Sequence, residues 1–502
     1  MFWTPPVNTR RFWLKKPKHK FSTSTPPILD YRNYFRRGER LLALSRQDWQ
    51  RCLKGGQPSA PTGLDLPNKK PLIEHLHPNI HIWMPLLKEA PASPPQNLSH
   101  KHLPMPQTQT INLATGKLTL NLTPGKIPLK RLLGFAARVS SKRKFLLVSK
   151  VLGKHYPVSP RMMAWSYRAL ARQTLQHDIT GESVWIGMAE TATGLGYGVF
   201  AAAVAEGLQH SLFMQTTRYH LDGLPRLGFD EAHSHATDFF LYYPERSDDQ
   251  RRFFNAQTLV LIDDEISTGR TFLRLINAYQ AVNPQLQNVF IVSLINFAHA
   301  EDRQRVEAGA GVAVHWVCLR EGTMHFDDAE NTELDSISVN VSGNSACKKH
   351  LLAWPGRLGL AAPMQFTNDV IAKLQQMGVD LHSDDPRPLL VLGTGECNPP
   401  AFMLGRLLES HGCPVKVQST TRSPIHVGND IASVCQFEDN YQDGIANFIY
   451  NLNTRDYRQI ILCHETPLCP PLLERLHDWQ AISARFELTD EAHHATLHFF
   501  RP

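Results

Sequence analysis

Short apolar runs alternate with polar turns and helical segments through most of the chain. The clearest run, Leu-Val-Leu-Ile at 259–262, has the length and composition of a strand that is buried on both faces of a parallel sheet. A polar turn follows it, and residues 272–282 then continue as a helix. A second strand, turn and helix occupy 184–187, 188–196 and 197–208. This order of elements predicts an α/β fold in which a parallel sheet is flanked by helices.

The remaining pattern adds elements on both sides of these two units. Residues 118–122 alternate like an edge strand, and Pro160 stands in the favoured first turn of a helix over 160–175. From residue 351 the pattern is α/β again, which predicts a second, smaller α/β domain. Further strands are expected at 210–215, 388–392, 415–419 and 459–462, and further helices at 366–376, at 401–411 and from about 438.

The turn after the first strand carries a recognisable chemistry. Asp263 and Asp264 stand at the end of the strand, where carboxylates accept hydrogen bonds from the vicinal hydroxyls of a sugar or lie near Mg²⁺. The rest of the turn offers backbone N–H groups and hydroxyls at a helix N-terminus, where a phosphate binds well. Together they predict a site for a phosphorylated ribose, with an ordinary strand-to-helix turn as the alternative. The phosphate-binding candidates are Ser267, Thr268, Gly269, Arg270 and Thr271.

The turn of the second unit is also rich in glycine and hydroxyl residues. Such residues suit the close approach of an anion at a helix N-terminus. Beside the first turn, it predicts a second phosphate-binding loop. Its candidate residues are Ala189, Glu190, Thr191, Ala192, Thr193 and Gly194.

Three C-terminal strands end in polar turns, and in an open α/β sheet ligands bind at that carboxyl edge. Arg422 with Ser423 is a candidate phosphate site, against a purely structural turn. No pair of nucleophile and base is visible in the spacing. The residues expected to converge there are Glu396, Thr421, Arg422, Ser423 and Glu465.

Composition adds little to the predicted fold and sites, but the net charge differs between the N-terminal part and the rest of the chain. The 502 residues suffice for two or three domains, and no run of 18 apolar residues predicts a membrane span. The eight cysteines form no CxxC pair, which favours a reducing cytoplasm. Residues 1–130 hold 20 Lys and Arg against 6 Asp and Glu, a net charge of +14; the whole chain is +7, so residues 131–502 carry −7.

The basic charge therefore belongs to an N-terminal extension, residues 1–111, which is also rich in proline. Its composition predicts a partly disordered segment with one short amphipathic helix near 34–53. Residues 1–29 loosely imitate an organelle transit peptide, and an incorrectly assigned start is a further alternative. A nucleic-acid contact is the sharper alternative, although no known motif supports it.

Strand, acid pair and Ser-Thr-Gly-Arg-Thr turn resemble the signature that type I phosphoribosyltransferases use for 5-phosphoribosyl-1-pyrophosphate (PRPP). Similarity to the orotate-phosphoribosyltransferase-like branch found in bacterial stress and tellurite-resistance gene clusters extends over segments 134–139, 148–158, 187–196, 216–219 with 231–237, and 263–271. Thr-Arg-Ser-Pro at 421–424 is the tetrapeptide of the TRSP domain attached to that branch. Many members have glycine where this chain has Arg270.

The resemblance implies a phosphoribosyltransferase domain at 112–320, a linker at 321–350 and a TRSP-type domain at 351–502. It implies that 189–194 holds the pyrophosphate of PRPP, that Mg²⁺ is the cofactor near Asp263 and Asp264, and that a homodimer is one arrangement to expect. Arg218 would neutralise pyrophosphate as it leaves, because a guanidinium forms bidentate phosphate contacts. For Lys150 and Lys154, the alternatives are charge at this site or solubility. Loop residues Glu231, His233 and His235 would bind the acceptor, move a proton or hold a metal, or are surface residues.

The leading hypothesis is thus a cytoplasmic phosphoribosyltransferase that makes or recycles a nucleotide or nucleotide-like metabolite from PRPP and an unidentified base. In it, the C-terminal domain handles a nucleotide or phosphate as an accessory. A second hypothesis is a non-catalytic regulator that senses PRPP or a nucleotide. In a third, the C-terminal domain is a hydrolase that acts on a phosphoribosyl compound.

Overall fold

The computed structural model describes residues 107–139, 143–179, 181–228, 239–329, 353–441 and 444–502. All of them belong to one compact unit, Leu76–Pro502. The extension 1–106, with the helix expected near 34–53, lies outside the described residues, as do Glu231, His233 and His235. Among the described helices, none is long and apolar enough to cross a membrane.

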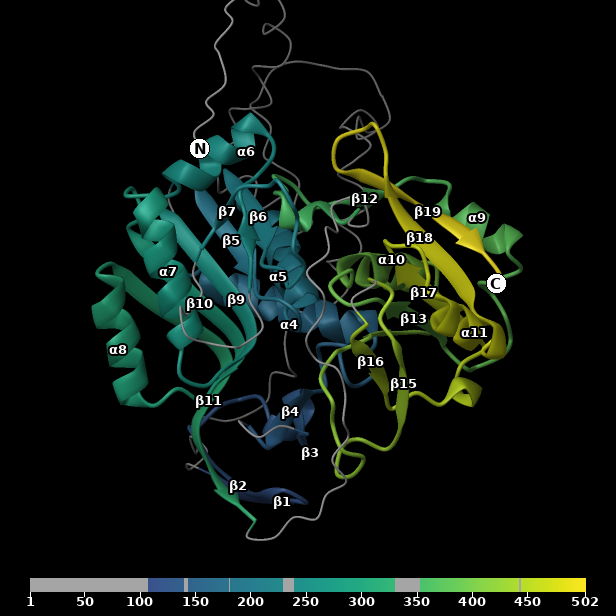
Figure 1. The fold of residues 1–502 in the computed structure, drawn as a ribbon, viewed down its shortest axis with the longest axis horizontal. Coiled ribbons are helices and arrows are strands. Elements are labelled where there is room, and N and C mark those ends of the chain that lie inside the picture. The colour runs from purple at the N-terminus through teal and green to yellow at the C-terminus, as the bar shows by residue number, and fades with distance from the viewer. Residues whose placement is uncertain (1–106, 140–142, 180, 229–238, 330–352, 442–443) are drawn as a thin grey trace, which may run out of the picture. The chain divides into compact units, whose positions relative to one another are not determined.

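A seven-stranded sheet forms the first part of this unit, in the order β1-β2-β11-β10-β9-β5-β6 (Figure 1). Strands β11, β10, β9, β5 and β6 run parallel, and β2 and β1 complete the sheet in antiparallel pairing. The expected strand 259–262 is confirmed within β9, which lies between two parallel neighbours and therefore reads as one apolar run. The bounds are β1 Gln107–Leu113, β2 Gly116–Leu122, β5 Ser183–Gly187, β6 Ser211–Gln215, β9 Thr258–Ile266, β10 Asn288–Asn296 and β11 Ala313–Asp328.

Helices cover both faces of this sheet, and alternate strand residues divide between them. Val260 and Ile262 pack into the core on the side of α4 (Pro160–Thr174) and α5 (Thr193–Ala205). Leu259 and Leu261 pack into the opposite core. The helices on that side are α6 (Ser247–Asn255), α7 (Arg270–Val282) and α8 (Ala300–Ala310).

Two expectations for this sheet are wrong in detail. Residues 118–122 are not an edge strand, because β1 pairs along the whole of β2. Helix α5 begins at Thr193 rather than at 197, since small residues let its first turn lie directly on β5: a Cβ on Gly196 would come within 2.5 Å of the Gly187 Cα.

A second sheet of six strands follows, in the order β12-β19-β18-β17-β13-β14. Strands β14, β13, β17 and β18 are parallel and β19 is antiparallel to β18, so the expectation of a second α/β part is confirmed. The strand bounds are β12 Gln365–Phe366, β13 Leu389–Gly393, β14 Val415–Ser419, β17 Gln459–His464, β18 Ile482–Leu488 and β19 His494–Phe500, and the helices are α9 Val370–Gln376, α10 Pro399–Ser410 and α11 Pro470–Asp478.

Two further expectations are corrected here. The helix predicted from 366 begins only at Val370, because Phe366 pairs with β19. The helix predicted from 438 is absent from the described residues: strand β15 (Val434–Glu438) ends there, and the Asp439 carboxylate accepts from the backbone N–H groups of Tyr441 and Ile445 at 2.7 and 2.6 Å. This carboxylate stabilises the loop that leads to β16 (Ala446–Tyr450).

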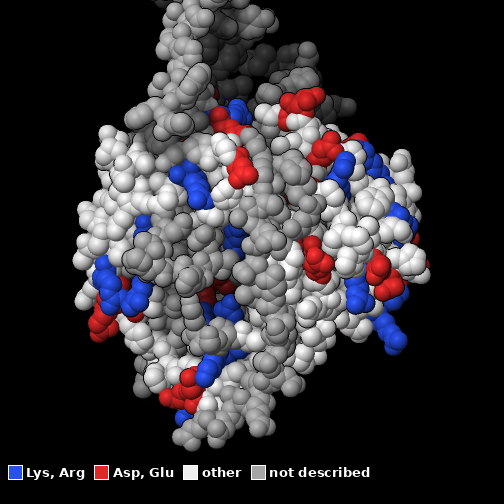
Figure 2. All heavy atoms as spheres, viewed as in Figure 1, with Lys and Arg blue, Asp and Glu red and all other residues white. Residues whose placement is uncertain are grey.

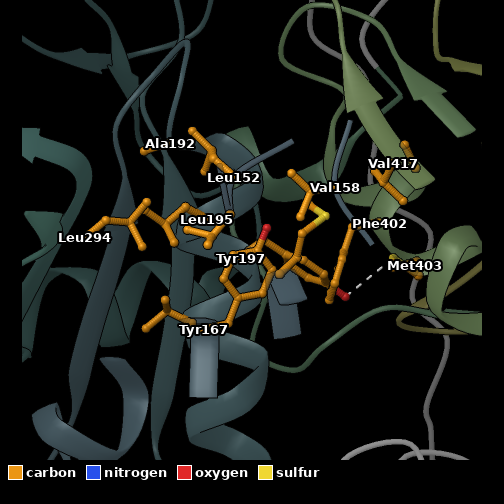
Figure 3. Close-up of a cluster of buried hydrophobic side chains, with 14 of the residues drawn as sticks. Leu152, Val158, Tyr167, Ala192, Leu195, Tyr197, Leu294, Phe402, Met403 and Val417 are labelled. Carbon is orange, nitrogen blue, oxygen red and sulfur yellow. Dashed lines mark hydrogen bonds between the residues drawn. The ribbon is translucent and has the colours of Figure 1, made fainter. Parts of the chain in front are cut away.

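The two sheets share one apolar core. Tyr167 of α4 meets Phe402 of α10 edge to face, with ring centroids 5.0 Å apart. The Tyr197 hydroxyl of α5 accepts from the Met364 N–H at 3.0 Å and lies 3.5 Å from the Met403 sulfur (Figure 3). This shared core fixes the position of one sheet relative to the other.

Candidate functional site

The two predicted phosphate turns lie side by side. Strands β5 and β9 are parallel neighbours, and their register pairs Gly187 with Ile262. The Met188 N–H donates to the Ile262 carbonyl at 2.9 Å, so both turns leave the sheet at one level. In a parallel sheet this carboxyl edge is where ligands bind.

The first turn leaves the backbone N–H groups at the N-terminus of α7 without a side-chain cap. Gly269 precedes the helix with φ of +71°, and a Cβ there would lie 2.9 Å from Val306 Cγ2, so this position needs glycine. No side chain caps α7, and the N–H groups of its first turn have no partner within the helix. Ser267 and Arg270 are exposed, whereas Thr268 and Thr271 are half-buried. This geometry suits an anionic group that arrives from solvent.

The acids lie within β9, which continues to Ile266. The Asp263 carboxylate accepts from the Asp264 N–H at 2.9 Å. Burial and then the adjacent Asp264 raise the pKa of Asp263 well above its usual value, while burial and then Glu265 raise the pKa of Asp264 to about 6. Arg143 pairs with Glu265, which leaves the aspartates as a half-buried concentration of negative charge.

A cation would relieve that charge, and carboxylate oxygens are the ligands that Mg²⁺ prefers. The two aspartates therefore fit a magnesium ion that takes its other ligands from a substrate or from water. Within the described residues, no group of three or more His, Cys, Asp or Glu is arranged to hold a metal by itself.

The second turn is folded tightly on the end of β5. The Ala189 N–H donates to the Thr216 hydroxyl at 2.8 Å, and the Ala192 N–H donates to the Met188 carbonyl at 3.0 Å. No side chain caps α5, which begins at Thr193. This second helix N-terminus lies beside the first turn and is far more buried.

Charged side chains surround the second turn. Glu190 lies 2.7 Å from the Lys154 ammonium and 3.1 Å from Arg422 Nε. Burial alone would raise the pKa of Glu190, but Lys154 and Arg422 together lower it to about 2. Lys154 is only 2% exposed, so its charge belongs to this cluster rather than to the solvent-facing surface. The side chain of Glu190 is thus engaged, and its loop offers a ligand mainly backbone N–H groups.

Arg218 adds another cation at the end of β6. Its guanidinium lies over the Phe239 ring, 4.4 Å from the centroid, and makes no ion pair with any residue that the structure describes. Burial and then Arg422 lower the pKa of Arg218, as expected for a cation held among other cations. On the face drawn in Figure 2, acidic and basic side chains are interspersed.

The C-terminal candidates meet, but around an arginine that the sequence did not single out. Arg357 donates to Glu396 at 3.1 Å and to Glu465 at 2.8 Å, and all three side chains are buried. The Thr217 hydroxyl and the Arg218 N–H also donate to Glu396, at 2.6 and 2.7 Å. Glu396 therefore connects the two parts of the chain, whereas Glu465 accepts from Trp354, Arg357 and Tyr441 of the C-terminal part.

The Thr-Arg-Ser-Pro turn lies at the same junction. Thr421 bridges to Phe448, and its hydroxyl accepts from the Ser423 N–H at 3.2 Å. The Ser423 hydroxyl lies 3.5 Å from Arg138 Nη2, and Arg422 reaches Glu190 as described. The sequence spacing predicts these residues at one sheet edge but does not indicate that Arg138 and Glu190, far away in the sequence, are their partners.

Family models match both parts of the chain. Residues 132–323 match a family described as phosphoribosyl transferase, and residues 354–479 match the TRSP domain that lies C-terminal to it. No curated protein matches the chain.

Solved structures give only weak likenesses. Adenine phosphoribosyltransferase from Trypanosoma brucei, in complex with AMP, pyrophosphate and ribose-5-phosphate, is 15% identical over 38% of this chain and 77% of its own, with a TM-score of 0.27. The enzyme from Rhodothermus marinus is 16% identical over 38% and 96%, with a TM-score of 0.26. Orotate phosphoribosyltransferase from Mycobacterium tuberculosis, in complex with Fe(III) dicitrate, is 15% identical over 38% and 91%, with a TM-score of 0.24.

These structural scores are low, so the assignment depends on the family models and on the order of the two matched regions. Residues 132–323 are therefore similar to the phosphoribosyl transferase family, and residues 354–479 to the TRSP domain that lies C-terminal to it in that family.

Proposed function

We propose that the protein transfers the phosphoribosyl group of PRPP to a base or nucleotide-like acceptor and releases pyrophosphate. The observation that carries this proposal is the adjacency of two uncapped helix N-termini, those of α5 and α7, at the ends of neighbouring parallel strands. PRPP carries a phosphate at one end of its ribose and pyrophosphate at the other, so two neighbouring anion sites match its shape.

Each candidate residue then has a role. The turn 267–271 would bind the 5-phosphate through backbone N–H groups and hydroxyls. Asp263 and Asp264 would accept hydrogen bonds from the ribose hydroxyls. The loop 189–194 and Arg218 would hold the pyrophosphate. These groups surround the ribose on the sides where PRPP carries hydroxyls and phosphates.

The chemistry needs positioning and charge neutralisation more than covalent catalysis. The bond from C1 of the ribose to the pyrophosphate oxygen breaks and its electron pair leaves with pyrophosphate, while a nitrogen lone pair of the acceptor forms the new bond to C1. The acceptor nitrogen then loses its proton to solvent. The aspartates would stabilise the positive charge that develops on the ribose, and Arg218 the negative charge on the leaving group.

Magnesium, if bound near Asp263 and Asp264, would neutralise charge on the pyrophosphate oxygens. The raised pKa values of both aspartates match a place prepared for a cation. Residues 263 and 264 would orient it through their carboxylates.

The direct test measures pyrophosphate release from PRPP and magnesium with a panel of bases. The double variant Asp263→Asn/Asp264→Asn should lose at least about a hundredfold in rate, because it removes charge stabilisation at the reacting carbon. Asp478→Asn, at an exposed position, is the matched control and should retain the rate. Binding of PRPP without turnover on any base would favour a sensor instead, and no binding of PRPP or any nucleotide would exclude both roles.

A further inference from the structure

The TRSP turn reaches across to the pyrophosphate loop of the transferase part. Arg422 follows β14, and its Nε donates to Glu190 at 3.1 Å. Its guanidinium also lies 5.4 Å from the ring centroid of Tyr219, which follows β6. The side chain is 13% exposed, so it is committed to this junction rather than to solvent.

The junction carries more cations than carboxylates. Glu190 faces Lys154 and Arg422, and Glu396 and Glu465 share Arg357. Arg138 and Arg218 have no carboxylate of their own among the described residues. Five cations thus face three carboxylates, a net charge of +2. Holding uncompensated cations away from water is costly, and a bound anion would remove that cost.

A small pocket lies beside Lys154 and is lined from both parts of the chain. Lys154, Thr191 and Gly194 come from the transferase side, and Asn398 and Gln418 from the TRSP side. Asn398 Nδ2 donates to the Thr193 hydroxyl at 3.1 Å, which joins the start of α5 to the TRSP part.

One buried nitrogen at this junction, Nη2 of Arg422, has no hydrogen-bond partner among the described residues. A guanidinium N–H donates and a phosphate oxygen accepts, so this nitrogen can bind an anion. Buried donors are normally satisfied, which favours an acceptor ligand at this place.

We propose that the TRSP domain completes the pyrophosphate site: Arg422 binds the pyrophosphate of PRPP together with Lys154 and Arg218. This inference deepens the proposed function and depends on it for the identity of the ligand. The protein then has one site built from both sheets, rather than a transferase site and a separate C-terminal site. Glu190 is a positioning residue, which holds Lys154 and Arg422 in place before the anion arrives.

The test uses inorganic pyrophosphate and ribose 5-phosphate as separate probes, with the full chain and isothermal titration calorimetry. Arg422→Gln should weaken pyrophosphate binding about tenfold or more, because it removes a charge-assisted contact. Binding of ribose 5-phosphate should be unchanged, since its phosphate would lie at α7. Arg485→Gln, which changes a half-exposed arginine of β18, is the matched control and should bind both probes as the wild type does.

Arg422→Gln leaves Glu190 with one partner fewer, so folding needs its own control. The double variant Glu190→Gln/Arg422→Gln removes both charges and should still bind pyrophosphate weakly, whereas Arg422→Lys should restore part of the affinity. Normal pyrophosphate binding by folded Arg422→Gln and by the double variant would overturn the inference, as would a wild type that binds none.

These outcomes separate the two proposals. Pyrophosphate binding that depends on Arg422, without any turnover of PRPP, would overturn phosphoribosyl transfer and leave the composite anion site standing. Turnover of PRPP by the wild type, together with unaltered pyrophosphate binding by Arg422→Gln, would overturn the composite anion site and leave phosphoribosyl transfer standing.

Discussion

The two ends of the candidate site are built in opposite ways. The proposed phosphate end at α7 consists of one continuous segment, 263–271, and its outer residues Ser267 and Arg270 are exposed. The proposed pyrophosphate end is buried and is built from Lys154, Glu190 and Arg422, which are far apart in the sequence. The first end depends on local backbone geometry, and the second depends on how the two sheets pack.

The largest effect on this contrast should come from Arg357→Met. The change leaves Glu396 and Glu465 buried without their cation, which typically costs about 3–5 kcal/mol of stability. Urea unfolding measures it. The triple variant Arg357→Met/Glu396→Gln/Glu465→Gln should recover much of the loss, and equal stability of Arg357→Met and the wild type would show that this triad does not hold the junction together.

Next in size is a pair of titrations with opposite signs. The pKa of Glu190 is lowered to about 2 in the folded state, so its ionised form stabilises the protein above the ordinary glutamate range. This contribution, about 3 kcal/mol, is lost as pH falls from about 4.5 towards 2. The pKa of Asp264 is raised to about 6, so stability declines as pH rises from about 4 to 6.

Unfolding free energies measured across pH distinguish these two groups. Asp264→Asn should gain stability over the wild type at pH 7 relative to pH 4, by about 1 kcal/mol or more. Glu190→Gln should lose stability at pH 7, and its deficit should shrink below pH 4. If the unfolding free energies of the two variants changed with pH at the same slope, the two ends of the site would not differ electrostatically.

A further substitution, Gly269→Ala, probes only the end of the site at α7. Gly269→Ala places a side chain in a left-handed conformation against Val306, at a cost of about 1–3 kcal/mol, and should weaken binding of ribose 5-phosphate. Gly311→Ala is the matched control, since its φ of +63° is similar but its Cβ would meet nothing within 4 Å. Equal losses in the two variants would leave no role for the contact with Val306.

The smallest effect should be that of Arg270→Gln. This exposed side chain at the start of α7 should change stability by less than about 0.5 kcal/mol. Ribose 5-phosphate binding at low salt should weaken by a few-fold at most, and the difference should vanish at high salt because exposed charges are screened. A large loss that persists in salt would indicate a direct phosphate contact.

The contrast also explains what could be predicted from the sequence. The strand 259–262 and its turn were predictable because strand burial, acid pair and helix start are all encoded within one segment. Strand β1, Gln-Thr-Gln-Thr-Ile-Asn-Leu, is mostly exposed and has no apolar alternation, so its pairing with β2 was missed. Phe366 was assigned to a helix because a two-residue strand depends wholly on its partner, β19.

Contacts between distant segments explain the remaining misses at the site. Nothing near Arg357 in the sequence indicates that two glutamates over 30 residues away will surround it. The composition of its loop predicts a phosphate-binding role for Glu190, but its carboxylate pairs with Lys154 and Arg422. The domain limits 112–320, 321–350 and 351–502, and the roles of the candidate residues, remain predictions.

The Tyr197 hydroxyl contacts both Met364 and Met403 in the shared core, and this contact limits how the sequences of related proteins can diverge. A substitution on one side of this contact therefore requires a compensating substitution on the other side. Among relatives, the positions of Tyr197 and Met403 should therefore change together. Recombination that joins the transferase part of one relative to the TRSP part of another should succeed only when the parental sequences agree at this contact.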